Sequence, residues 1–413
     1  MWRRSTDARS RCTISARTRR LQLHAQCPSI DTVALFAEIN ADSLRQTVLD
    51  LQNFGSRYAL RDGGNQEVAE YIVGRLNRYG IPAIVDTFHE SGHHWIGGDY
   101  DQLFYNVKGI LASPTPADDS LVLLGAHLDA IALSPSYTLL NTAPGADDNA
   151  SGVAVMLELA RICHLHNLQF SREVHFMAYD GEELGLFGSV HDAWVRQDAG
   201  EKIAVMLNND MVSFQPTDDW RLTLHWYPNA QDIVARAAEI CAQYTDIEPV
   251  IPTGNDNNDA QYSDSYAYYQ QGFRAVFAIE NIFSTSYHTE HDVADSNNYD
   301  YLADVARYNL AMLFEYANAG TLSVHEVASV PQLNAYPNPA SDRMMLQYTL
   351  AESADVEVEI SDMTGRTLLR RTEGSQQGGS HLLELDLSAL PAGMYLCRLH
   401  TTAGSTSIKL VKQ

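Results

Sequence analysis

The sequence predicts an α/β protein in which a mixed, largely parallel sheet is flanked by helices, followed by a small all-β sandwich. Strand and helix patterns alternate over residues 40–320, which is the order of elements that builds an α/β fold. After residue 320 the pattern changes to short strands without helices. The composition, with 45% hydrophobic and 19% charged residues, is that of a globular protein and excludes disorder as the main state.

In the first domain, expected over 40–320, helices are predicted where apolar residues recur every three or four positions. This spacing predicts helices over 44–51, 68–76, 151–166 and 301–316. Gly80 is placed to end the second of these helices. Short, continuously apolar runs predict strands over 106–112, 121–126, 173–178, 203–207 and 275–279. The alternation of the two patterns favours a parallel or mixed sheet.

The second domain is expected over 334–413, after a linker at 321–333. Alternation of apolar and acidic residues predicts strands over 356–360 and 383–387. Short strands of this kind, separated by turns, are typical of a small immunoglobulin-like sandwich.

The first 39 residues differ from the rest of the chain in charge. Seven arginines and a single acid, Asp7, occupy residues 1–20, whereas the whole chain has a formal charge of −24. This basic head lacks the apolar run of a secretory signal, although residues 21–26 are similar to the end of one. Two interpretations stay open: a disordered basic extension, or a leader remnant behind a misassigned start.

Charge, hydropathy and cysteine usage exclude several classes of protein. A charge of −24 argues against nucleic-acid binding, which needs clustered lysine and arginine. No run approaches 18 consecutive apolar residues, so no membrane span is expected. The five cysteines have neither paired spacing nor an even count, which argues against a disulfide framework. Cys163 and Cys241 lie in helical patterns and are expected to be buried thiols.

Five polar segments occur where predicted strands end or helices begin, at 125–129, 144–152, 180–183, 208–210 and 287–292. In α/β enzymes the carboxyl ends of the strands form the active-site edge. Each segment alone is more typical of a structural role, such as a helix N-cap or a satisfied His–Asp pair. A series of two histidines and three carboxylates is not typical of turns. It suits two Zn²⁺ ions roughly 3.5–4 Å apart with one carboxylate between them.

The order and wording of these segments resemble the co-catalytic zinc exopeptidases, the family of bacterial aminopeptidases and glutaminyl cyclases. The sequences that carry the resemblance are GSRY at 55–58, GAHLD at 125–129, PGADDNASG at 144–152, DGEELGLFGS at 180–189, NNDM at 208–211 and YHTEHD at 287–292. The resemblance covers about residues 40–320 and implies the zinc exopeptidase fold.

A two-zinc site is implied by this resemblance. His127 and Asp210 would hold one zinc ion, Glu183 and His288 would hold the other, and Asp148 would bridge them. In this family the bridging acid directly precedes the Asn/Asp-Ala/Gly-Ser-Gly run, and the peptide bond after it is typically cis.

Three catalytic roles are also implied. Asp129 would orient His127, because two residues apart on a strand they point to the same side. Glu182 would act as general base for a metal-bridged hydroxide that attacks the scissile carbonyl. Tyr287 matches the position of a phenol that hydrogen-bonds the oxyanion in some members, and a packing role stays open as the alternative.

These features predict a secreted di-zinc metallo-aminopeptidase that hydrolyses N-terminal residues from peptide substrates. A carboxypeptidase would need Arg or Lys near the metals, and the five segments contain none. Two alternatives remain open: a one-zinc glutaminyl cyclase of the same fold, and a non-catalytic surface binding protein. The run 183–189 lacks the insertion of animal cyclases, which favours the peptidase.

Residues 334–413 resemble the C-terminal sorting domain of the type IX secretion system of Bacteroidetes. The matching sequences are AYPNPASD at 335–342, DMTG at 362–365, LPAGMY at 390–395 and IKLVK at 408–412. The resemblance implies export across the outer membrane by the type IX machinery, to the medium or the cell surface. A carbohydrate-binding or spacer module is the alternative.

Overall fold

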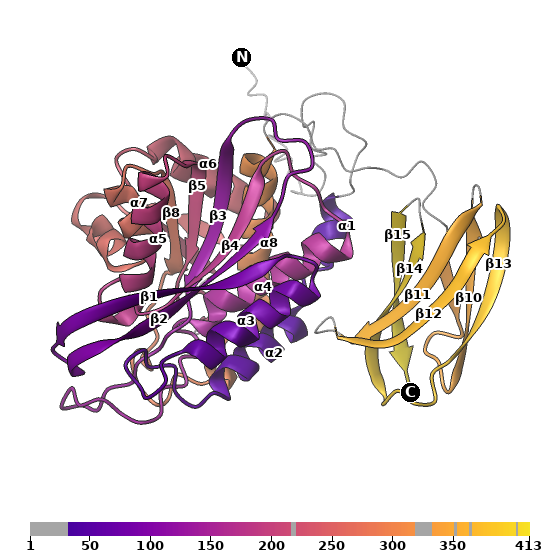
Figure 1. Cartoon of the computed structure of the whole chain (residues 1–413), viewed down its shortest axis with the longest axis horizontal. Coiled ribbons are helices and arrows are strands. Elements are labelled where there is room, and N and C mark those ends of the chain that lie inside the picture. Colours follow the sequence, from indigo (N-terminus) through magenta and orange to yellow (C-terminus); the bar gives the residue numbers. More distant parts are fainter. Residues whose placement is uncertain (1–31, 216–219, 319–332, 351–352, 363–365, 402–403) are drawn as a thin grey trace, which may run out of the picture.

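The alternating elements of the first domain form one eight-stranded sheet between helices (Figure 1). The computed structural model describes residues 32–215, 220–318, 333–350, 353–362, 366–401 and 404–413. The strands lie in the order β1 (Ala83–His94), β2 (Gly98–Leu111), β4 (Glu173–Tyr179), β3 (Ser120–His127), β5 (Lys202–Asn209), β8 (Ala275–Glu280), β6 (Arg221–Trp226) and β7 (Glu248–Val250). The central strands β4, β3, β5 and β8 are parallel to one another, whereas β1 and β2 run antiparallel to their neighbours. Strand β6 is antiparallel to β8 and parallel to β7. The sheet is therefore mixed with a parallel centre, as predicted.

Most helices cover one face of this sheet and contribute to its main apolar core. They are α1 (Thr32–Ala37), α2 (Ala41–Gln52), α3 (Gln66–Arg78), α4 (Ala150–Leu165), α6 (Gln231–Tyr244) and α8 (Tyr299–Ala317). The other face carries α5 (Phe187–Asp198) and α7 (Ser265–Gln270), which pack in a second apolar cluster. Strands β3, β4 and β8 are buried almost throughout because helices cover both of their faces.

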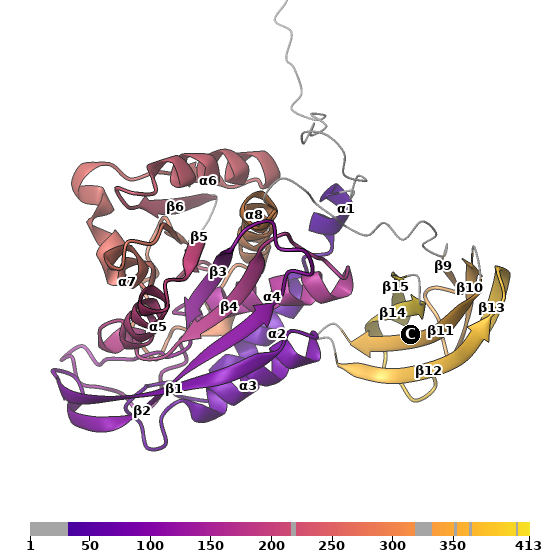
Figure 2. The ribbon, with the colours of Figure 1, turned by 45° about the horizontal axis from the view of Figure 1, so that its top comes forward.

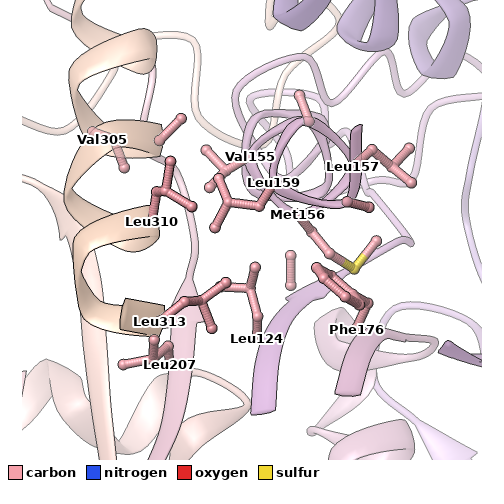
Figure 3. Packing of buried hydrophobic residues seen from close by; sticks show 14 of the residues in the cluster. Leu124, Val155, Met156, Leu157, Leu159, Phe176, Leu207, Val305, Leu310 and Leu313 are labelled. Atoms are coloured by element: carbon pink, nitrogen blue, oxygen red, sulfur yellow. The ribbon is translucent and has the colours of Figure 1, made fainter. Parts of the chain in front are cut away.

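Helix α4 occupies the centre of the main core. Nearly all of its residues are buried, so it lacks a polar stripe. Figure 3 shows Val155 and Leu159 of α4 beside Leu310 of α8, with Leu124 of β3 below them. The helix begins at Asn149, whose side chain accepts a hydrogen bond from the amide of Gly152. The start of α4 is therefore fixed against the end of the sheet where the polar segments lie.

The N-terminal boundary differs slightly from the expected one. The described chain begins with α1, and Leu35, Phe36 and Ile39 are buried in the main core, so the folded part starts before residue 40. The basic head at 1–31, with Cys12 and Cys27, lies outside the described residues. Cys163, Cys241 and Cys397 are buried free thiols, as predicted for the first two.

The C-terminal domain consists of two sheets with an apolar core of their own. One sheet contains β13 (Gly379–Asp386), β10 (Arg343–Leu350) and β9 (Leu333–Tyr336). The other contains β12 (Thr367–Gln376), β11 (Ala354–Asp362), β14 (Gly393–Thr401) and β15 (Gly404–Lys412). Val356, Val358 and Ile360 of β11 are buried in this core, as the alternation predicts. The two sheets are separate from the large sheet (Figure 2).

Within the described ranges, no helix combines the length and the apolar character that a membrane crossing requires.

Candidate metal centre

The five polar segments meet at the carboxyl ends of the central strands. His127 is the last residue of β3, and Asp210 directly follows β5. Glu182 and Glu183 begin a single 3₁₀ turn just after β4. Asp148 lies in the loop that leads into α4, and His288 lies in the connection from β8 to α8.

Two histidines face the two oxygens of one carboxylate. His127 Nε2 lies 3.2 Å from Asp148 Oδ1 and 3.1 Å from Asp210 Oδ1. His288 Nε2 lies 3.2 Å from Asp148 Oδ2 and 2.8 Å from Glu183 Oε2. Asp148 is thus shared between two groups of three ligand atoms, and the structure brings together all five residues predicted as ligands. The Asp148–Asn149 peptide bond is cis, as the family resemblance implies.

The donor atoms suit zinc in type and in spacing. Nitrogen and oxygen donors at about 2.0–2.1 Å from a tetrahedral zinc ion lie on the order of 3.3 Å from one another, close to the separations above. Glu183 Oε1 is buried and makes no hydrogen bond within the described part of the chain. A buried polar atom without a partner is costly, and a bound cation would satisfy it.

Charges in the centre are shared between carboxylates and histidines. Burial and then the neighbouring Asp148 raise the pKa of Glu183 to about 7. The pKa of Asp148 is lowered, because His127 and His288 outweigh the effect of burial. Burial would lower the pKa of His288, but Glu183 and Asp148 raise it to about 10. Metal-free, the site therefore holds protons that a divalent cation would displace.

Asp129 lies behind this centre in the position expected for an orienting residue. Its Oδ1 is 3.4 Å from His127 Nδ1, on the side of the ring away from Asp148. The same carboxylate accepts hydrogen bonds from the backbone amides of Glu182 (3.1 Å) and Glu183 (3.2 Å). Asp129 therefore holds both a histidine and the turn that follows β4.

Asp292 holds the loop before α4 in the same way, and the sequence analysis did not predict this role. Its two carboxylate oxygens accept hydrogen bonds from the backbone amides of Asp147 (2.9 Å) and Asp148 (3.0 Å). Its place at the end of the YHTEHD run was the only available indication. Asp292 thus holds the backbone from which Asp148 projects.

A buried serine supports Asp210, and sequence reasoning missed it as well. Ser263 Oγ donates to Asp210 Oδ2 at 2.6 Å and accepts from Asn208 Nδ2 at 2.6 Å. Its place beside Asp264 in the run YSDS at 262–265 was the only indication of such a role.

Tyr287 lies at the mouth of the centre. Its ring stacks on that of His288 with centroids 3.7 Å apart and meets Phe283 edge-on at 5.6 Å. The residue is 41% exposed, so it is not a core packing residue. Burial of its hydroxyl and the nearby Asp148 and Glu183 raise its pKa, which keeps the phenol protonated at neutral pH.

A cavity of about 230 Å³ opens over these residues. Glu182, Tyr287 and the five candidate ligands line its polar side. The apolar side chains that line it are Met211, Phe277, Ile279 and Phe283. Asp259 and Tyr262 also contribute to its wall. A reacting group held at the polar side would thus have an apolar wall beside it.

Comparisons with known proteins find relatives of both domains. The profile of Peptidase family M28 matches residues 106–313, half of the chain, and the profile of the secretion system C-terminal sorting domain matches residues 334–413. The chain is 30% identical over 270 residues to the uncharacterized protein YfbL of Escherichia coli, covering 59% of this chain and 81% of that protein. It is 29% identical over 218 residues to a probable zinc metalloprotease of Pyrenophora teres; this match covers 48% of the chain but only 44% of the fungal protein's length.

Solved structures share the fold of the first domain. An aminopeptidase from Aneurinibacillus sp. superposes with a TM-score of 0.58 at 16% identity, covering 71% of this chain and 98% of that one. A glutaminyl cyclase from Fimbriiglobus ruber gives 0.54 at 19% identity, covering 66% and 94%.

Proposed function

Because the chain belongs to peptidase family M28, and is therefore a zinc-dependent metallo-exopeptidase, we propose that it is a secreted di-zinc aminopeptidase. One observation carries the proposal: Asp148 presents one oxygen to His127 and the other to His288. A carboxylate shared in this way is the expected centre of a two-metal site.

The proposed ligands are those that the geometry groups together. His127 and Asp210 would hold one zinc ion, Glu183 and His288 the other, and Asp148 both. Zinc bound here would polarise the scissile carbonyl and make a water molecule more acidic.

Glu182 is the proposed general base. One of its carboxylate oxygens lies within 4.8 Å of donor atoms of both His127 and Asp210, so it borders the place where the reaction would occur. Burial is the main cause that raises its pKa well above the ordinary value, which suits a group that must accept a proton and release it again. Glu182 would take the proton of the attacking water and pass it to the leaving amine.

Tyr287 is proposed to stabilise the oxyanion. Its hydroxyl stays protonated, as argued above, and can donate a hydrogen bond to the carbonyl oxygen as negative charge develops. The stacking of its ring on His288 fixes that donor next to a ligand.

An N-terminal residue fits the remaining features of the site. A free α-ammonium group would find negative charge at Glu182 and Asp210, whereas the residues that line the cavity include no lysine or arginine to bind a terminal carboxylate. The apolar wall formed by Met211, Phe277 and Ile279 favours an apolar first side chain.

The functions of the separate segments of the chain are also a proposal. We assign catalysis to residues 40–320 together with α1, a linker role to 321–333, and export to 334–413. The C-terminal match to a sorting domain places the protein outside the cell or on its surface. Recognition by the type IX secretion machinery is the proposed partner interaction of that domain.

The test combines metal quantification with substrate assays on the purified protein. We expect two zinc ions per chain and hydrolysis of leucine anilide that chelation abolishes and zinc restores. Glu182→Gln should keep its zinc while kcat falls by roughly 10²–10⁴-fold. Glu290→Gln, an exposed substitution near the site, should behave as wild type.

Three results would contradict the proposal. One zinc ion with cyclisation of N-terminal glutamine and no peptide hydrolysis would favour a glutaminyl cyclase. Zinc without any turnover would favour a binding protein. An unchanged rate for Glu182→Gln would remove the assignment of the base.

A further inference from the structure

Arg57 is a buried cation directly beneath the candidate metal centre. Only 1% of its surface is exposed, and its guanidinium donates only to backbone carbonyl oxygens within the described structure. Nε donates to Leu128 O at 2.8 Å, Nη1 to Pro144 O at 2.7 Å, and Nη2 to Gly145 O at 2.7 Å. A weaker bond joins Nη1 to Leu51 O at 3.3 Å.

These carbonyl groups belong to two different ligand-bearing loops. Leu128 lies between His127 and Asp129, whereas Pro144 and Gly145 precede Asp148. Gly145 makes this approach feasible, because a Cβ atom at that position would lie 2.7 Å from Arg57 Nη2. A single planar side chain therefore ties both loops together.

The positive charge of Arg57 interacts with several nearby carboxylates and is not paired with one of them. Burial lowers its pKa to about 10, and the nearby Asp292, Asp129, Asp148 and Glu183 act against that effect. The group therefore remains charged at neutral pH. Asp292 accepts from the backbone amide of Asp148 and Asp129 from that of Glu183, and Asp148 and Glu183 are themselves candidate ligands.

Without bound metal, the carboxylates of the centre repel one another, and a nearby cation can reduce this repulsion. Several carboxylates converge there, and like charges at close range destabilise the arrangement that brings them together. Bound zinc would neutralise them, but the protein must fold before it holds zinc.

We propose that Arg57 is a positioning residue that supplies, while zinc is absent, part of the positive charge that zinc supplies when bound. This inference rests on the proposed metal centre. It assigns Arg57 no contact with substrate; its effect is to keep the loops of His127 and Asp148 together in the metal-free protein.

The experiment compares thermal unfolding of the full chain with and without zinc, following the transition of the first domain. Arg57→Gln removes the charge, and Arg57→Lys retains it without the planar fork. The matched control is Arg196→Gln. Arg196 is equally buried, but it lies in α5 and pairs with Asp192 of the same helix.

We expect the zinc-induced rise in Tm to be larger for Arg57→Gln than for wild type by roughly 3–6 °C. Loss of the charge should weaken the metal-free state more than the zinc-bound state. Arg57→Lys should show the wild-type rise. Arg196→Gln should lower both transitions equally and leave the rise unchanged.

Other outcomes would overturn the inference. If Arg57→Gln lowers Tm by the same amount with and without zinc, Arg57 is an ordinary structural residue. If Arg57→Gln folds only when zinc is present, the proposal is supported. If Arg57→Gln folds neither with nor without zinc, the test relies on Arg57→Lys. A zinc-induced rise in Tm that is larger for Arg57→Lys than for wild type would refute a role for the charge. No rise in wild type itself would instead overturn the metal centre.

Discussion

At the scale of single residues, charge is balanced differently at the carboxyl edge of the central sheet and on the face that α5 covers. At the carboxyl edge, carboxylates and histidines share protons. On the face covered by α5, Arg196 pairs with Asp192 and Glu201 and also donates to His175 Nδ1 at 3.1 Å. His175 is therefore held neutral, because a proton on Nδ1 would replace this hydrogen bond with repulsion.

This environment makes His175 a source of acid sensitivity. Burial, followed by the charges of Arg196 and Lys108, lowers its pKa to about 3, whereas an unfolded histidine titrates near 6.5. The folded state thus binds the proton less tightly, so the contribution of His175 is complete above about pH 6.5 and is lost as pH falls toward 3. We expect Tm to fall between pH 7 and pH 5, and to fall less for His175→Gln.

The control for this prediction is His89→Gln. His89 lies on the exposed β1–β2 hairpin, with its side chain 56% exposed, and this variant should follow the pH profile of wild type. Identical slopes for His175→Gln and wild type, measured by calorimetry at pH 7, 6 and 5, would show that His175 does not cause the acid sensitivity.

The residue scale also shows what sequence could reveal about the site. His127, Asp148, Glu183, Asp210 and His288 stand in recognisable runs, and all of them meet in the structure. The backbone contacts of Arg57 and Asp292 were not predicted, although both residues stand in the runs GSRY and YHTEHD. Arg57 donates to carbonyl groups and Asp292 accepts from amides, and the residue type at the other end of such a bond leaves no pattern in the sequence.

At the scale of elements, the start of α4 is attached to the end of β5. The Asn149 side chain accepts from Gly152 N at 2.9 Å and donates to Asn209 O at 2.9 Å. Gly152 lies so close that a Cβ atom there would be 2.3 Å from Asn209 O. This contact fixes the distance between Asp148, just before the helix, and Asp210, just after the strand.

Gly152→Ala should therefore lower both stability and zinc affinity. The added methyl group must push α4 away from β5, which costs about 1–3 kcal/mol and separates ligands on the two elements. Chemical denaturation and zinc titration measure the two effects.

Gly74→Ala is the matched control. Gly74 lies inside α3, and a Cβ atom there would meet nothing within 4 Å. Alanine at this position should raise stability by about 0.5–1 kcal/mol without changing zinc binding. A neutral Gly152→Ala, alongside a stabilised Gly74→Ala, would show that the contact between α4 and β5 can relax.

The strands that could be predicted from the sequence are those buried in the core, because burial selects for apolar residues. The central strands β3, β4, β5 and β8 were predicted from continuous apolar runs. The hairpin strand β1 was not, because Phe88 is its only fully buried apolar residue and it shows no regular alternation. It pairs with β2 along its whole length, and this pairing depends on backbone hydrogen bonds that are independent of side-chain pattern.

At the scale of the whole molecule, the two domains have separate apolar cores. Few side chains link them in the described structure; among these, Leu396 packs against the main core and Arg398 Nη1 lies 3.0 Å from His164 Nε2. The contact with His164 lies at the C-terminal end of α4, the end opposite to Asp148.

Removal of residues 334–413 should leave kcat/KM on leucine anilide within about twofold of the full chain, because no ligand or cavity residue comes from that segment. Export should be lost in the host. Activity assays on the truncated protein and fractionation of cells that express it check both parts. A loss of zinc or turnover on truncation would show that the sorting domain completes the catalytic unit.

The two carboxylates that hold backbone amides have a consequence for evolution. Asp129 fixes the chain at Glu182 and Glu183, and Asp292 fixes it at Asp147 and Asp148, in each case through atoms that every residue type except proline possesses. These hydrogen bonds therefore do not depend on the side chains that the four residues display. A descendant of this protein could exchange the displayed residues, and with them the metal preference or the chemistry, while inheriting the same loops unchanged.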